Sequence, residues 1–169
     1  MEVTPTLFTA DYVGEPGSRT FYLQARTDAG TLSFLLEKQQ VSVLADRLRE
    51  LLIALDGSDS IGTSVPERDP ALALAEPVEP EWRVGTMGLA YQQDEDRVLL
   101  VLQAAEEEGE DDDQDAVRFA LRRDQVRTFV LHAQAIVDEG RPLCQLCGLP
   151  IDPSGHACPA SNGHRLSVI

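Results

Sequence analysis

The chain has 169 residues, of which 43% are apolar and 25% charged, so it can fold around a hydrophobic core instead of remaining disordered. Its 29 acidic residues outnumber 14 basic ones and give a net charge of −15. This acidity disfavours nucleic-acid binding, because that affinity depends on lysine and arginine neutralising phosphates. It disfavours anionic membrane surfaces for the same reason. We therefore expect neither nucleic acid nor membrane as a partner.

The first residues, Met1–Pro5, lack the basic and then apolar segments of a signal peptide. No apolar stretch approaches the roughly 20 residues that span a bilayer. The three cysteines all lie between positions 144 and 158, whereas a disulfide framework would use an even, dispersed set. The sequence therefore predicts a cytoplasmic protein whose thiols are available as ligands.

The first 56 residues carry the periods of strands and then of a helix. Residues 20–26 and 32–37 alternate apolar with polar side chains, which is typical of half-buried strands. The period then changes to 3.6, and the apolar stripe consists of Val41, Leu44, Ala45, Leu48, Leu51 and Leu52. Gly57 is expected to end this helix. Residues 57–80 follow with four prolines and several glycines and serines, a composition that predicts a linker.

The second half, residues 81–140, resembles the first. Phe-Tyr-Leu-Gln-Ala at 21–25 matches Leu-Val-Leu-Gln-Ala at 100–104, and Gln40 matches Gln125 once six extra residues are allowed. Residues 117–122 alternate like 32–37. A second helical stripe follows, formed by Val126, Phe129, Val130, Ala133, Ile136 and Val137, and Gly140 is expected to end it.

These patterns predict an α+β fold built from two tandem β-β-β-α repeats, residues 1–56 and 81–140. Because three-stranded sheets are individually marginal, we expect them to join about a pseudo-two-fold axis into one antiparallel sheet core backed by two helices. The alternative is two unrelated segments that look alike because such segments generally do.

The insertion that separates the matched parts of the second repeat is strongly acidic. Residues 106–115 carry eight carboxylates, and removing these eight charges from −15 leaves −7. The stretch lacks the ordered spacing of an EF-hand loop. We interpret it as a solvated loop, with docking of a basic partner or a loose Ca²⁺ or Mg²⁺ site as alternatives. His132 aligns with Arg47 and is predicted to be an exposed surface histidine.

Residues 141–169 contain the pattern of a metal-binding tail. Cys144 and Cys147 are spaced as in a zinc knuckle, and the glycine that follows permits a left-handed backbone. Residues 152–155 (Asp-Pro-Ser-Gly) predict a type I turn, after which His156 and Cys158 would face the same side of an extended segment. We expect a small hairpin that holds zinc.

The predicted ligands are Cys144, Cys147, His156 and Cys158, with His164 as the alternative fourth ligand. Four protein ligands leave no position for water, so this zinc would be structural. A redox Cys-x-x-Cys is the main alternative, but that motif precedes a helix in thioredoxin-like proteins, and Gly-Leu-Pro follows here.

The ending Cys-x-x-Cys-Gly-Leu-Pro-Ile-Asp-Pro-x-Gly-His-x-Cys-Pro, after a two-copy β-rich body, resembles an uncharacterised actinobacterial family labelled domain of unknown function 3090. The resemblance covers essentially the whole chain. It implies a cytoplasmic bacterial protein, transfers no catalytic residue, and favours Cys144, Cys147, His156 and Cys158 as the metal set.

The sequence contains no Gly-x-Ser-x-Gly, no phosphate-binding Gly-x-x-x-x-Gly-Lys and no His-Glu-x-x-His. We therefore expect a non-enzymatic, zinc-stabilised adaptor or regulator whose partner is another protein. The alternative is a zinc-dependent hydrolase, or a protein that binds a small molecule in a pocket between the repeats. The oligomeric state is left open.

Overall fold

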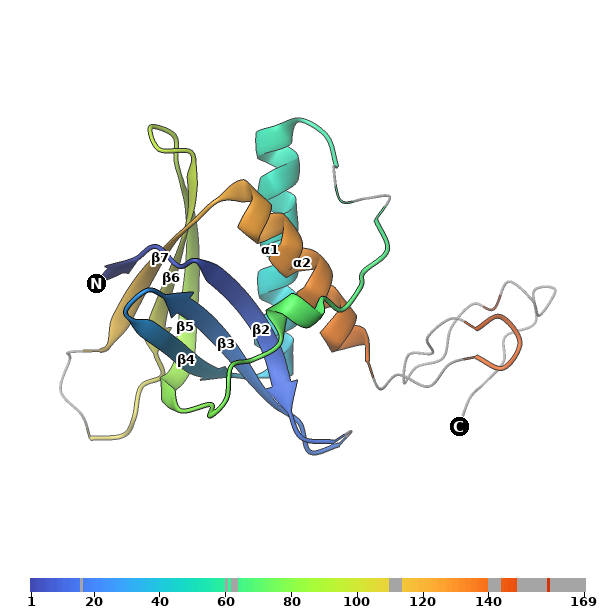
Figure 1. Cartoon of the computed structure of the whole chain (residues 1–169), viewed down its shortest axis with the longest axis horizontal. Coiled ribbons are helices and arrows are strands. Elements are labelled where there is room, and N and C mark those ends of the chain that lie inside the picture. The colour runs from blue at the N-terminus through green and yellow to red at the C-terminus, as the bar shows by residue number, and fades with distance from the viewer. Residues whose placement is uncertain are drawn as a thin grey trace. The chain divides into compact units, whose positions relative to one another are not determined.

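The computed structural model describes residues 1–15, 17–59, 61, 64–109, 114–139, 144–148 and 158. The chain divides into two compact units, a body of Met1–Val137 and a tail of Asp138–Ile169. The body contains the sheet and the helices that cover it (Figure 1).

The elements of the described residues follow the predicted order of strands, helix, strands, helix. The strands are β1 (Glu2–Val3), β2 (Leu7–Val13), β3 (Thr20–Thr27), β4 (Gly30–Leu36), β5 (Pro80–Gln92), β6 (Arg97–Ala104) and β7 (Ala116–Leu121). The helices are α1 (Lys38–Asp56), the short 3-10 helix η1 (Pro70–Leu72) and α2 (Arg123–Asp138).

The strands form one mixed sheet in the order β1-β7-β6-β5-β4-β3-β2. Within each half the neighbours are antiparallel, as predicted. The prediction of an entirely antiparallel sheet is wrong at two junctions, because β4 runs parallel to β5 and β1 runs parallel to β7. The reason at the central junction is that α1 and the segment after it form a crossover, which returns the chain to the end of the sheet where β4 began.

The sheet curls until its two edges approach each other. β1 and β2 are the edges, yet only three residues separate them along the chain. Four phenylalanines meet inside the curl: the ring centroids of Phe8 and Phe119 are 5.4 Å apart, and Phe8 is 5.0 Å from Phe129 of α2. Phe34 lies 5.8 Å from Phe119. Edge-to-face and tilted pairs at such distances add about 0.5–1.5 kcal/mol each beyond area burial.

Both predicted helical stripes lie in this core. The buried residues of α1 include every predicted member except Leu51, which is half-buried, and all six predicted members of α2 are buried. Gly57 ends α1 in a left-handed conformation (φ 72°), and its N–H donates to Ile53, as the sequence predicted. The predicted helix-ending Gly140 lies outside the described residues.

The two helices begin with the same side-chain device. Oε1 of Gln40 accepts the backbone N–H three residues earlier (2.8 Å), and its Nε2 donates to the carbonyl of Val84 (3.1 Å). Oε1 of Gln125 likewise accepts the N–H three residues earlier (3.0 Å), and its Nε2 donates to the carbonyl of Pro5 (2.9 Å). The repeat alignment pairs Gln40 with Gln125, and the offset that matches residues 21–25 with 100–104 also places Pro5 opposite Val84. This correspondence supports the tandem repeat, which stays a prediction.

Part of the predicted linker packs on the body. Residues 64–79, called the strap from here on, run past β2 and β3 on the way to β5, and η1 lies against β2 (Figure 1). Leu72 of η1 is 6% exposed, and several buried polar side chains bond to the strap.

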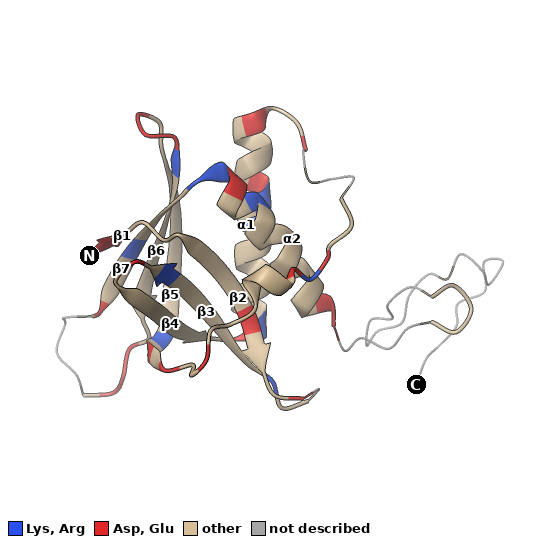
Figure 2. Ribbon diagram, viewed as in Figure 1, with Lys and Arg blue, Asp and Glu red and all other residues tan. Residues whose placement is uncertain are grey.

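In the body, charged residues occur mostly on loops, at strand ends and along the helices (Figure 2). Of the acidic insertion, residues 110–113 lie outside the described residues, and the carbonyl of Asp115 accepts the N–H of Ala104 at its base (2.8 Å). Within the described part of the chain, no helix combines the length and apolar character needed to cross a bilayer.

Candidate metal centre

Cys144 and Cys147 lie on one tight turn of the tail. The backbone N–H of Gly148 donates to the carbonyl of Cys144 (2.8 Å), which closes the turn. Gly148 has a φ of 73°, in the left-handed region that a side chain disfavours. The glycine therefore has the role that the sequence assigned to it, since it lets two cysteines three residues apart point to the same side.

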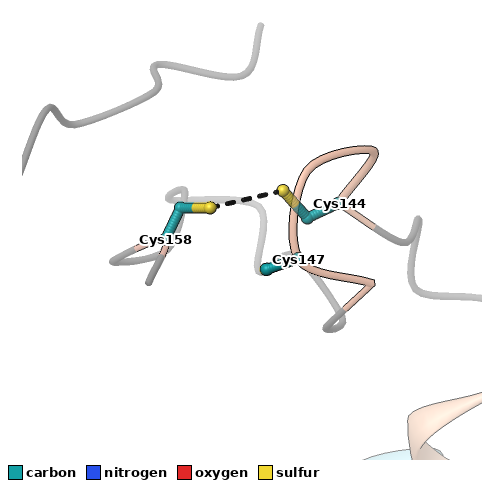
Figure 3. Close-up of side chains that lie close together, drawn as sticks. All are labelled: Cys144, Cys147 and Cys158. Atoms are coloured by element: carbon teal, nitrogen blue, oxygen red, sulfur yellow. Dashed lines mark hydrogen bonds between the residues drawn. The ribbon is translucent and has the colours of Figure 1, made fainter. Parts of the chain in front are cut away.

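Cys158 returns to this turn from 14 residues further along the chain. Its Sγ lies 3.7 Å from Sγ of Cys144 (Figure 3), and the three Sγ atoms lie within 4.8 Å of one another. Cys144 and Cys158 are buried, and Cys147 is half-buried. Thiolates bound to zinc at about 2.3 Å in a tetrahedron are separated by about 3.8 Å. The separation of Cys144 and Cys158 fits such a site.

The turn also prepares Cys144 for binding a cation. The backbone N–H groups of Cys147 and Leu146 point at its sulfur and lower the pKa of the Cys144 thiol. Burial opposes this by raising the pKa, and the thiols of Cys147 and Cys158 add smaller effects in the lowering direction, so the pKa of the Cys144 thiol is lowered overall. Since metals bind the thiolate, this environment favours the form that serves as a ligand.

The structure brings together three of the predicted ligands. His156, the alternative His164 and the predicted turn at 152–155 all lie outside the described residues. The described residues thus provide three sulfur ligands from two separate segments.

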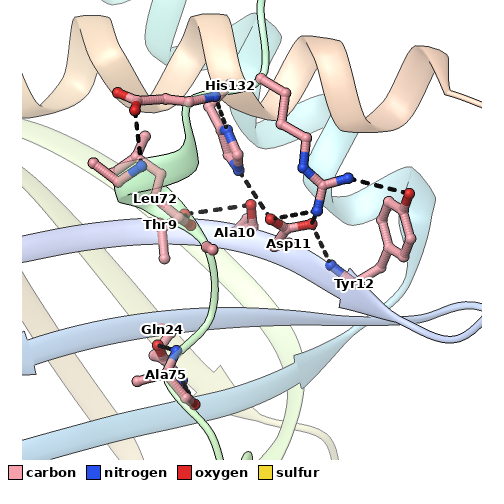
Figure 4. Close-up of polar contacts among 12 residues, drawn as sticks. Thr9, Ala10, Asp11, Tyr12, Gln24, Leu72, Ala75 and His132 are labelled. Atoms are coloured by element: carbon pink, nitrogen blue, oxygen red, sulfur yellow. Dashed lines mark hydrogen bonds and ion pairs between the residues drawn. The ribbon is translucent and has the colours of Figure 1, made fainter.

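The body contains a second polar cluster, which the sequence did not predict. Oδ2 of Asp11, on β2, lies 3.2 Å from Nε2 of His132, on α2 (Figure 4). The side chains are 2% and 1% exposed. Nη2 of Arg68 donates to both oxygens of Asp11, at 2.9 and 3.1 Å, and Nδ1 of His132 accepts the backbone N–H of Asp69 (2.9 Å).

The prediction that His132 is exposed is therefore wrong. His132 follows Phe129 by three residues and precedes Ile136 by four, which places it beside the buried stripe of α2. This spacing indicates a buried position. The alignment with Arg47, which is exposed on α1, indicates the opposite and led to the wrong prediction. Because Nδ1 accepts a backbone N–H, the imidazole carries its proton on Nε2 and donates it to Asp11. Both ring nitrogens are hydrogen-bonded within the fold, so the geometry assigns this pair to holding the strap.

The comparison with protein families decides the affiliation of the chain. A family described as "Protein of unknown function (DUF3090)" matches residues 3–158, which is most of the chain. The chain belongs to this family. No curated protein and no solved structure matches it significantly.

The resemblance to an uncharacterised family is thereby confirmed. The matched segment of the DUF3090 family runs through both halves of the body and ends at Cys158. It therefore includes the three clustered cysteines and position 156 and ends before position 164. The family description assigns no activity.

Proposed function

We propose that this protein is a non-enzymatic adaptor or regulator of the cytosol that binds another protein and whose tail is folded around one structural Zn²⁺. The observation that carries the metal site is the convergence of three cysteine sulfurs, with Cys144 and Cys158 at 3.7 Å. A thiolate-rich tetrahedral set suits zinc better than the hard cations, which prefer oxygen ligands.

The proposed fourth ligand is His156, with His164 as the alternative. His156 is two residues from Cys158, and an extended segment would present both to the turn. With three sulfurs and one imidazole the coordination is closed, so the metal would stabilise the tail without activating water.

The proposal of a protein partner rests on composition and on the absence of a catalytic arrangement among the described residues. The excess of acidic residues opposes binding to phosphate backbones. The buried histidine and carboxylate of the body are fully used in internal bonds. These features favour a binding role over an enzymatic one.

Elemental analysis of purified protein tests the metal site. The wild-type chain is expected to contain one zinc, Cys158→Ala and His156→Ala to lose it, and His164→Ala to keep it. Loss in His164→Ala instead would make His164 the ligand. Zinc retained in both histidine variants would indicate three protein ligands and an open coordination position on the metal. That result would favour the alternative function, a zinc-dependent hydrolase. Absence of zinc from the wild-type chain would overturn the proposal.

A further inference from the structure

Three buried polar side chains form a row across the sheet where the strap lies. Thr9 of β2 is in register with Gln24 of β3, and Gln24 is in register with Ser33 of β4. All three are buried, and Thr9 and Gln24 are fully so. Polar groups in such a place are unfavourable unless they are hydrogen-bonded. Gln24 bonds to Ser33 within the row (3.1 Å) and accepts from Nε of Arg26 (3.4 Å), and Thr9 has a long contact with the carbonyl of Ala10 (3.4 Å). The shorter bonds of Thr9 and Gln24 are made with the strap.

Side chains of the body hold the main chain of the strap. The amide of Gln24 pairs with both backbone groups of Ala75: Oε1 accepts the N–H (2.8 Å), and Nε2 donates to the carbonyl (3.1 Å; Figure 4). Thr9 donates to the carbonyl of Leu72 (2.6 Å), and Arg26 donates to that of Ala73. These bonds do not depend on the strap's side chains, so they would contribute equally to any segment with the same backbone path and do not by themselves select a sequence.

Two side chains of the strap provide the sequence-dependent contacts. Nη2 of Arg68 donates to both oxygens of the buried carboxylate of Asp11. Leu72, four residues later, is buried. Most neighbouring strap side chains are exposed, including those of Val65, Glu67, Ala71 and Ala73. The surface therefore recognises a backbone, one arginine and one leucine.

We propose that this surface, formed by Thr9, Asp11, Gln24, Arg26 and His132, is a peptide-binding groove that the strap fills in cis. Its partner is a protein segment that carries arginine four residues before leucine and takes the place of the strap. In other peptide-binding domains, main-chain hydrogen bonds supply affinity and side-chain pockets supply specificity. This inference rests on the proposed protein-binding role and gives that role a surface and a ligand chemistry.

The strap competes with such a partner because it is covalently attached. A tethered segment binds as if present at about millimolar concentration, so the wild-type groove is closed to a weak ligand. Beside the strap an open groove of about 650 Å³ is lined by Arg68, Arg127 and Leu131, among others. From this side an incoming segment would meet Arg68 of the strap first.

The test is binding in trans. Residues 64–79 are replaced by a glycine–serine linker of equal length, and a fluorescent peptide of the native 64–79 sequence is titrated by anisotropy. The linker variant is expected to bind one peptide per chain, and the wild-type chain to bind it about 100-fold more weakly. The peptide with Arg68→Ala and Leu72→Ala should lose binding. A matched peptide with Glu67→Ala and Ala71→Ser, both at exposed positions, should keep it.

The proposal is overturned by a folded linker variant that does not bind the native peptide. It is also overturned if that variant binds the native peptide and the peptide with Arg68→Ala and Leu72→Ala equally well. If the linker variant does not fold, the full chain with Arg68→Ala and Leu72→Ala replaces it, since this variant keeps the strap backbone but weakens its hold. It should bind the native peptide more tightly than wild type does, and equal binding overturns the proposal. Zinc content is measured in the same samples. Absence of peptide binding in protein that contains zinc contradicts the proposed groove but not the metal site. Peptide binding by protein that contains no zinc contradicts the metal site but not the groove.

Discussion

Asp11 is the residue on which the buried polar contacts of the body converge. Its carboxylate accepts from Arg68 and from His132, and Oδ1 also accepts the backbone N–H of Tyr12 (2.8 Å). A buried carboxylate is tolerated when several donors surround it, and removal of one donor leaves a charge without compensation. The stability of the body should therefore be sensitive to single substitutions around Asp11.

The substitution His132→Leu should destabilise the protein by about 3 kcal/mol, because it removes a donor to Asp11 and leaves the N–H of Asp69 without its acceptor. Urea unfolding followed by circular dichroism measures this loss. The matched control is Arg47→Leu, at the aligned position of α1, whose side chain is 67% exposed and whose change should stay within about 0.5 kcal/mol. Equal small effects of both substitutions would show that His132 is not part of a buried network.

Asp96 should make the free energy of unfolding depend on pH. Hydrogen bonds from the hydroxyl of Tyr91 (2.6 Å) and from Arg123 (2.8 Å) lower the pKa of Asp96 below its ordinary value. A carboxyl group with a lowered pKa in the folded state adds stability above its unfolded pKa, and this is lost as the pH falls through the folded value.

The variant Asp96→Asn should therefore be less stable than wild type above about pH 5, and the difference should shrink below about pH 4. Urea unfolding at a series of pH values measures it. A difference that stays constant down to pH 2 would contradict the lowered pKa. Tyr91→Phe is a useful companion, since loss of the first hydrogen bond should raise the pKa of Asp96 in an NMR titration.

At the level of elements, the two helix starts are the sharpest test of the repeat. Gln40→Leu and Gln125→Leu each remove the acceptor for one N–H and the donor for one carbonyl, so each should cost about 1–3 kcal/mol in urea unfolding. Gln125 is the more deeply buried and should show the larger loss. Gln39→Leu, at an exposed position of α1, is the control. A loss at only one of the two glutamines would argue that the halves are not equivalent.

The elements differ in how far the sequence predicts them, because they depend on different interactions. The stripes of α1 and α2 are local patterns, and burial of one helix face is enough to explain them. The parallel junction of β4 with β5 depends on where a long crossover ends, which no local pattern specifies. The strap shows the same limit, since its prolines and glycines predict a linker while its contacts with Thr9 and Gln24 come from residues more than 50 positions away.

At the level of the whole molecule, the described residues of the body and of the tail differ in how much hydrophobic core they contain. The body has a continuous hydrophobic cluster contributed by both halves of the sheet and both helices. In the tail, the buried cluster of the described residues consists of cysteines. So small a unit gains little from burial, whereas a structural zinc site can contribute about 10–16 kcal/mol at neutral pH.

The sequence predicts the part of the candidate metal site in which the ligands lie close together along the chain. Cys144, Cys147 and Gly148 form the expected turn, and Cys158 joins it as the spacing indicated. The choice between His156 and His164 depends on the path of the chain after the knuckle, which spacing does not determine. The pairing of Asp11 with His132 joins residues 121 positions apart, so no local sequence motif predicts it.

Limited proteolysis of the full-length chain, read by mass spectrometry with and without a zinc chelator, shows whether a bound metal folds the tail. Chelation is expected to expose new cleavage sites within residues 141–169 while Met1–Val137 stays resistant, and Cys158→Ser is expected to give the same pattern without chelator. An unchanged cleavage pattern in a sample shown to have lost its zinc would contradict the claim that the metal folds the tail.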